Sequence, residues 1–181
     1  TRRTGWSVAN GQIDLAIIGG QLPADLENLL QVIPYATDEL ALVLPTKHPL
    51  SNKKELLKED LYKLNFVTLD TQSTTRKVVD RLLQDSGLEI QRLKIEMELN
   101  SLEAIKNAVQ SGLGASFLPV VSIERELAAG TIHKAFVADL EVERELKLIT
   151  NPSRYTSRAS EVFKKNILPQ FASLNSPLRK L

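Results

Sequence analysis

Short apolar runs alternate with amphipathic stretches along this chain, and this alternation predicts buried strands separated by helices. Strands are predicted at the apolar runs of residues 13–18, 39–44, 66–69, 93–97, 115–118 and 145–150. Helical spacing predicts helices at residues 4–10, 56–61, 120–127 and 157–171, between Thr75 and Ser86, and between Asn100 and Gly112. Such an order favours an α/β protein with mainly parallel sheets that are covered on both faces.

The stretch from residue 97 to residue 119 predicts a strand, a capped helix and a second strand. Asn100 is placed to cap the helix, and Glu103 follows three residues later, as in a capping box. Gly112 suits the left-handed residue that ends a helix. Asn100 and Ser101 therefore lie where backbone N–H groups and the positive end of the helix dipole favour a small anionic ligand. The alternative is that both residues only cap the helix.

A second loop rich in hydroxyl groups lies between a predicted strand and a predicted helix. Its candidate ligand-binding residues are Thr71, Gln72, Ser73, Thr74 and the nearby Arg76. Hydroxyls, backbone N–H groups and a guanidinium together suit a carboxylate or a phosphate. A loop that supplies only a helix cap is the alternative here as well.

A third candidate loop follows the predicted strand of residues 13–18 and contains Ile18, Gly19 and Gly20. Ligands of open α/β sheets gather at the carboxyl ends of the strands, so the three loops could converge on one cleft. Asp14 lies earlier in this strand. It could act as a general base, but a carboxylate just after an Asn-Gly turn more often bonds nearby backbone or a basic side chain.

Composition excludes several classes of protein. The 181 residues carry 23 basic and 22 acidic side chains, a formal net charge of +1, so direct DNA binding by this chain is not expected. The longest apolar runs are too short to span a bilayer, and no membrane partner is expected. The absence of cysteine suits a reducing compartment, by default the cytosol or an organelle stroma. No catalytic residue, metal ligand or cofactor site is assigned, because the two histidines are isolated and no nucleotide fingerprint occurs.

Several motifs together resemble the effector-binding domain of LysR-type transcriptional regulators. The resemblance rests on residues 11–17, on Leu-Pro at 44–45 followed by His-Pro-Leu at 48–50, and on residues 109–114 followed by Leu-Pro at 118–119. The stretches at residues 10–20, 69–74 and 98–106 further resemble the Rubisco-operon regulators of cyanobacteria and algal plastids. The related regulators of bicarbonate transport remain an alternative.

The resemblance implies a periplasmic-binding-protein-like (type II) fold, with two Rossmann-like subdomains joined by two crossover strands. Subdomain I would contain residues 1–64 and 147–175, with its first strand before Thr1. Subdomain II would contain residues 65–146, and residues 176–181 would form a tail. A closing motion about the crossover strands would then respond to an effector in the cleft between the subdomains.

The resemblance also implies partners. The effector would be a small anionic metabolite of carbon fixation: ribulose bisphosphate, phosphoglycolate or NADPH. The domain would form a homodimer, and a tetramer in the full-length protein, which would bind promoter DNA only through an N-terminal winged helix-turn-helix absent from these residues. The expected location is the cyanobacterial cytoplasm or the plastid stroma. A transporter's solute-binding protein and, less favoured, a sugar-phosphate enzyme using Asp14 or Asp70 are the alternatives.

Overall fold

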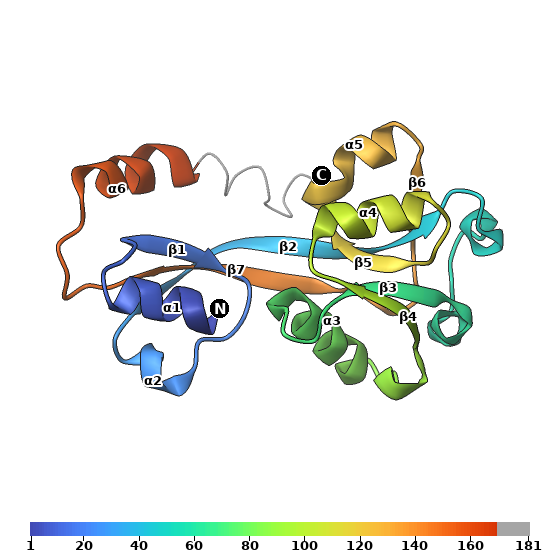
Figure 1. Ribbon diagram of the computed structural model, residues 1–181, viewed down its shortest axis with the longest axis horizontal. Helices are drawn as coiled ribbons and strands as arrows, with labels where there is room; N and C mark the ends of the chain where they lie inside the picture. Colours follow the sequence, from blue (N-terminus) through green and yellow to red (C-terminus); the bar gives the residue numbers. More distant parts are fainter. Residues whose placement is uncertain (170–181) are drawn as a thin grey trace. The chain divides into compact units, whose positions relative to one another are not determined.

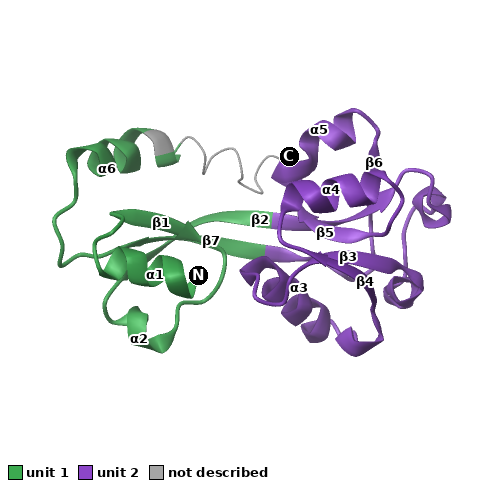
Figure 2. Ribbon diagram, viewed as in Figure 1, with its two compact units in different colours: residues 1–38, 144–181 green, residues 39–143 purple. Residues whose placement is uncertain are grey.

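The computed structural model describes residues 1–169, and the chain divides into two units (Figures 1 and 2). Of the described residues, 1–38 and 144–169 form unit 1, and 39–143 form unit 2. The helices are α1 (Arg2–Ala9), α2 (Ala24–Glu27), α3 (Thr74–Asp85), α4 (Leu102–Gln110), α5 (Val120–Ala128) and α6 (Arg158–Val162). The strands are β1 (Leu15–Ile18), β2 (Gln31–Pro45), β3 (Asn65–Leu69), β4 (Lys94–Leu99), β5 (Ser116–Pro119), β6 (Ile132–Ala135) and β7 (Glu143–Thr150).

Short helical turns complete the described chain. They are 3-10 turns at Pro49–Asn52, Lys58–Lys63 and Ile90–Arg92, and a π-helical turn at Phe163–Ile167. The helix predicted at residues 56–61 is therefore a 3-10 turn that begins two residues later. The predicted tail at residues 176–181, and the predicted helix end at residue 171, lie outside the described residues.

Unit 1 is organised around the antiparallel pair of β1 and β7, in which Leu15 lies opposite Thr150 and Ile18 opposite Lys147. Helices α1 and α2 contact each other, and α1 also contacts β1 (Figure 1). The buried core joins these elements and consists of Val8, Ala9, Ile18, Leu22, Leu26, Leu30 and Ile149. Burial of these apolar side chains is the main stabilising contribution in the unit.

Unit 2 combines antiparallel and parallel strand pairing. The second half of β2 pairs antiparallel with β5 and with β6. Strand β3 pairs parallel with β4, and a parallel bridge from Phe66 to Ala115 connects β3 to the start of β5. Two apolar clusters pack here, one that includes Leu40, Phe66 and Leu83 and one that includes Val43, Ile105 and Ile123.

The prediction of mainly parallel sheets was wrong. Strands β3 and β4 form a parallel ladder, whereas β1–β7, β2–β5 and β2–β6 are antiparallel. The cause is burial on both faces of β2: residues 40–44 are all at most 5% exposed. Such burial gives a continuous apolar run whichever way the neighbouring strand points, so the run does not report pairing direction.

The two units have other bounds than the predicted subdomains. The predicted subdomain I included residues 39–64, which lie in unit 2 in the structure, and the return to unit 1 comes at Arg144, not at residue 147. The reason is packing: Leu42, Leu56 and Leu64 share one buried cluster with Phe66.

Candidate functional site

Two helix N-termini lie next to each other in unit 2 because the strands that precede them are parallel neighbours. Leu69 at the end of β3 lies opposite Leu99 at the end of β4, and the Asp70 N–H donates to the Leu99 carbonyl at 3.1 Å. Helix α3 follows β3 after four residues, and α4 follows β4 after two (Figure 1). The hydroxyl-rich loop and the Asn100–Ser101 turn therefore start from the same edge of the same two strands.

Serine side chains cap both helices. Ser73 Oγ accepts from the Arg76 N–H, and Ser101 Oγ accepts from the Ala104 N–H, each at 3.5 Å. The prediction that Asn100 caps α4 was therefore wrong by one residue. Asn100 is exposed and lies before the cap. Because Ser101 already sits at the N-cap, residue 103 occupies N2 and cannot complete the capping box with Asn100.

The hydroxyl-rich loop is held in shape by Asp70. Its Oδ1 accepts from the Gln72 N–H at 2.8 Å, and its carbonyl accepts from the Ser73 N–H at 3.0 Å. Thr71 and Gln72 are exposed, and Thr74 is partly buried. The loop thus presents polar side chains to solvent directly beside the N-terminus of α3, where the helix dipole favours negative charge.

Arg76, predicted to complete this cradle, is instead buried and bound within unit 2. It is 9% exposed, and its Nε lies 2.8 Å from both carboxylate oxygens of Asp80. Its Nη1 donates to the Thr68 hydroxyl, to the Leu69 carbonyl at 3.1 Å and to Glu98 at 3.3 Å. This guanidinium therefore ties α3 to β3 and β4, and two carboxylates balance its charge.

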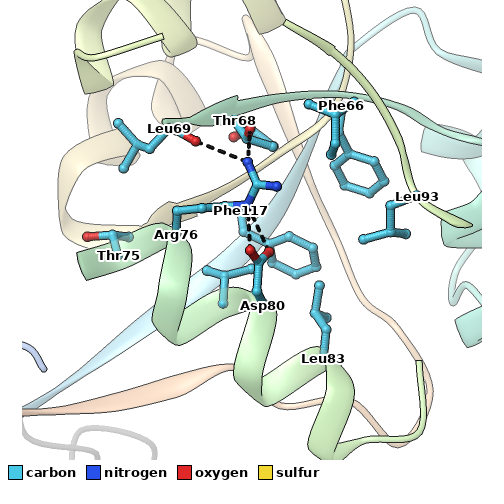
Figure 3. A pocket seen from close by; sticks show the side chains of 12 residues that line it. Phe66, Thr68, Leu69, Thr75, Arg76, Asp80, Leu83, Leu93 and Phe117 are labelled. Atoms are coloured by element: carbon cyan, nitrogen blue, oxygen red, sulfur yellow. Dashed lines mark hydrogen bonds and ion pairs between the residues drawn. The ribbon is translucent and has the colours of Figure 1, made fainter. Parts of the chain in front are cut away.

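A small cavity adjoins Arg76 and runs beneath α3 (Figure 3). Phe66 and Phe117 form part of its apolar wall, with ring centroids 6.2 Å apart and nearly parallel planes. Its volume of about 30 Å³ suits a water molecule and is far below that of a small-molecule site. A phosphorylated metabolite does not fit into it.

The candidate loop of unit 1, residues 18–20, lies partly in the apolar core and partly at the surface. The Ile18 side chain is 5% exposed and belongs to the apolar core, so it is unavailable to a ligand. Gly19 and Gly20 are partly exposed. Gly19 packs against Arg144, a residue that the sequence analysis did not single out.

Asp14 has a structural role in unit 1. Its Oδ2 accepts from the Ser157 N–H at 3.3 Å and from the Ser157 and Ser160 hydroxyls. These hydrogen bonds, mainly that from the Ser157 hydroxyl, hold the pKa of Asp14 below its ordinary value. The carboxylate thus stays ionised and tethers the N-terminus of α6, which makes it a poor general base near neutral pH.

Asp14 lines an open pocket of about 350 Å³, together with residues that include Asn151 and Arg154. Both of these side chains donate to the Ala9 carbonyl, at 3.0 and 2.9 Å, and so close the C-terminus of α1. No group of three or more His, Asp or Glu side chains among residues 1–169 could hold a metal ion. The polar groups gathered here serve the fold of unit 1.

Residues 3–172 match the family model described as LysR substrate binding domain. The chain belongs to this family. Within it, the chain is 57% identical over 173 residues to a Synechocystis protein named "Probable RuBisCO transcriptional regulator", covering 96% of the chain and 50% of that protein. A protein of the same name from Porphyra purpurea is 56% identical, with 96% of the chain and 55% of that protein covered.

Solved structures show the same fold at lower identity. The Synechocystis CcmR regulatory domain, solved in complex with 2-PG, matches with a TM-score of 0.78 and 21% identity, over 98% of this chain and 80% of that one. The effector-binding domain of QuiR, in complex with shikimate, matches with a TM-score of 0.76 and 21% identity, over 97% of this chain and 79% of that one. The periplasmic-binding-protein-like fold expected from the resemblance is thereby confirmed.

The LysR domain spans about half the length of the Synechocystis and Porphyra relatives. Among residues 1–169, none of the helices combines the length and apolar character that a bilayer crossing requires. The interactions that sequence reasoning missed are those of Arg76 and Arg144. The pair of Arg76 with Asp80 has the i,i+4 spacing of a helix, but the partners Glu98 of Arg76 and Asp38 of Arg144 are 22 and 106 residues away, where no local pattern indicates them.

Proposed function

We propose that this chain is the effector-sensing domain of a transcriptional regulator of carbon-fixation genes and that its effector is a small phosphorylated metabolite. The observation that carries the proposal is the pair of neighbouring helix N-termini in unit 2, flanked by Thr71, Thr74 and Ser101. Such termini favour a dianion through their N–H groups and their dipoles. Three relatives named as probable RuBisCO transcriptional regulators, at 56 to 58% identity, support the carbon-fixation assignment.

The candidate effectors are phosphoglycolate, ribulose bisphosphate and NADPH, all of which carry phosphate groups. The CcmR regulatory domain, which shares this fold, is in complex with 2-PG in its structure, and phosphoglycolate is therefore the first ligand to test. We place the phosphate at the N-termini of α3 and α4 in unit 2. That one ligand engages both units remains a prediction.

Signal output would follow from a shift between arrangements of the domain. An effector changes such an equilibrium only through its different affinities for the arrangements. We assign promoter binding to a winged helix-turn-helix in a longer protein, as suits relatives about twice as long, with a homodimer or tetramer as the working form. The cytoplasm of cyanobacteria or the plastid stroma would be its location, and no catalytic activity is proposed.

Ser101 provides the sharpest test of the site. Alanine would also remove the α4 cap, at about 0.5–2 kcal/mol of stability, so aspartate is the better substitution. Ser101→Asp keeps a good cap but adds a negative charge beside the proposed phosphate site. We expect at least about a tenfold loss of phosphoglycolate affinity at unchanged thermal stability, measured by calorimetric titration.

Ser101→Asn is the matched control, because it preserves the cap without adding charge. Its affinity should stay within about threefold of the parent, a difference below 1 kcal/mol. If aspartate binds as tightly as asparagine, the phosphate is not at α4. If the parent binds none of the three candidate metabolites, the carbon-fixation assignment fails while membership of the LysR family stands.

A further inference from the structure

The open pocket of unit 1 is lined by side chains of opposite charge that do not pair with each other. Asp14 and Arg154 both line this pocket of about 350 Å³, and no ion pair of 4.0 Å or less joins the two. The volume is that of a small-molecule site, for which about 300–1,000 Å³ is usual. Each charge is therefore available to a ligand that carries the opposite one.

The Arg154 guanidinium is held in place at only one of its nitrogens. Its Nε donates to the Ala9 carbonyl at 2.9 Å. A Cβ on Gly11 would lie 2.9 Å from Nη1 and 3.0 Å from Cδ, so the arginine lies directly over the Gly11 backbone. Neither Nη1 nor Nη2 has a hydrogen-bond partner among residues 1–169. These two NH₂ groups form the edge with which a guanidinium binds both oxygens of a carboxylate.

Asp14 is held in a similar way, through one carboxylate oxygen. Its Oδ2 accepts from the Ser157 N–H and from the hydroxyls of Ser157 and Ser160, whereas Oδ1 has no partner in the described part of the chain. The same hydrogen bonds lower the pKa of Asp14, so its carboxylate is negative near neutral pH. Oδ1 therefore remains as an acceptor for an ammonium group.

We propose that this pocket binds a small zwitterion, an α-amino acid with an apolar side chain. The ligand carboxylate accepts from Nη1 and Nη2 of Arg154, and the ligand ammonium group donates to Oδ1 of Asp14. Val8, Ile13 and Tyr155 also line the pocket and supply apolar surface for the ligand side chain. All of these residues belong to unit 1, so the site gives the domain a second small-molecule ligand that does not depend on the phosphate site in unit 2.

Leucine and two analogues that each lack one charge test the two contacts separately. Leucinamide keeps the ammonium group, and 4-methylpentanoate keeps the carboxylate. Solvent-accessible ion pairs are weak, so each analogue should bind the parent about fivefold more weakly than leucine does. Arg154→Gln should weaken leucine by about the same factor without weakening leucinamide. Asp14→Asn keeps an oxygen that accepts from the serine hydroxyls, and it should weaken leucine without weakening 4-methylpentanoate.

Arg158→Gln is the matched control for Arg154→Gln. Arg158 is also exposed, begins α6 and does not line the pocket. Its substitution removes the same charge from the same part of unit 1, yet it should leave the affinity for leucine within about twofold of the parent. Equal weakening of leucine in Arg154→Gln and Arg158→Gln would show a general effect of net charge and would overturn the proposal.

The experiment is an NMR titration of the intact parent protein and the three variants with leucine, leucinamide and 4-methylpentanoate. It is carried out at about pH 6.5, where an α-amino group is protonated. The expected result is saturable binding of leucine to the parent, with the losses stated above. No saturable binding of leucine, or equal affinity of the parent for the three probes, overturns the site. The comparison of probes on the parent decides the question even where Asp14→Asn does not fold.

Discussion

Replacing Gly114 by alanine is expected to destabilise unit 2 by about 3 kcal/mol, because the added methyl group meets backbone. A Cβ at this position would lie 2.6 Å from the Asn65 carbonyl oxygen and 3.2 Å from its carbon. The two segments cannot separate freely, since the Ala115 N–H donates to that same carbonyl at 2.8 Å and the Val67 N–H donates to the Ala115 carbonyl at 2.9 Å. Urea unfolding measures the loss as a lower midpoint.

Gly112 is the control for this substitution. Its φ of +84° disfavours alanine, but a Cβ there would meet nothing within 4 Å. Gly112→Ala should therefore cost only about 1 kcal/mol, the usual penalty of a left-handed residue with a side chain. If the two variants unfold at the same urea concentration, the close approach of Gly114 to β3 does not contribute to stability as proposed.

These two glycines also show how far sequence reasoning extends. A left-handed residue at the end of a helix has a local signature, so Gly112 was assigned correctly from its place after an amphipathic stretch. Gly114, two residues later, has no such signature. Its actual role is set by Asn65, which lies 49 positions earlier, and no local pattern contains that information.

The candidate site likewise combines features that have a local sequence signature with features that depend on residues far away in the sequence. Periodicity placed α3 and α4 after β3 and β4, and the parallel pairing of Leu69 with Leu99 then brings the two helix N-termini together. The cap at Ser101 was missed by one residue because asparagine and serine cap equally well. The binding partners of Arg76 could not be predicted, because an arginine beside a hydroxyl-rich loop can bind either a ligand or neighbouring carboxylates.

Arg76→Gln is the second substitution with a large expected effect, and it separates these two roles. Glutamine cannot replace the contacts to Asp80, Glu98, Thr68 and Leu69, and it leaves the partly buried Asp80 carboxylate without its cation. The carboxylates left behind are 28% and 42% exposed, so the cost is below that of a fully buried pair, at about 2 kcal/mol. We expect a loss of this size in urea unfolding, with phosphoglycolate affinity little changed in the folded fraction.

Arg81→Gln is the control on the same helix. Arg81 and Asp85 have the same spacing as Arg76 and Asp80, but they are 3.7 Å apart and about two-thirds exposed, so their pair should contribute less than about 0.5 kcal/mol. A large difference between the two variants would show that burial, not helical spacing, makes Arg76 important. The opposite pattern, with stability retained and phosphoglycolate affinity lost in Arg76→Gln, would mean that the guanidinium leaves Asp80 for the ligand. Arg76 would then belong to the effector site, as the sequence alone suggested.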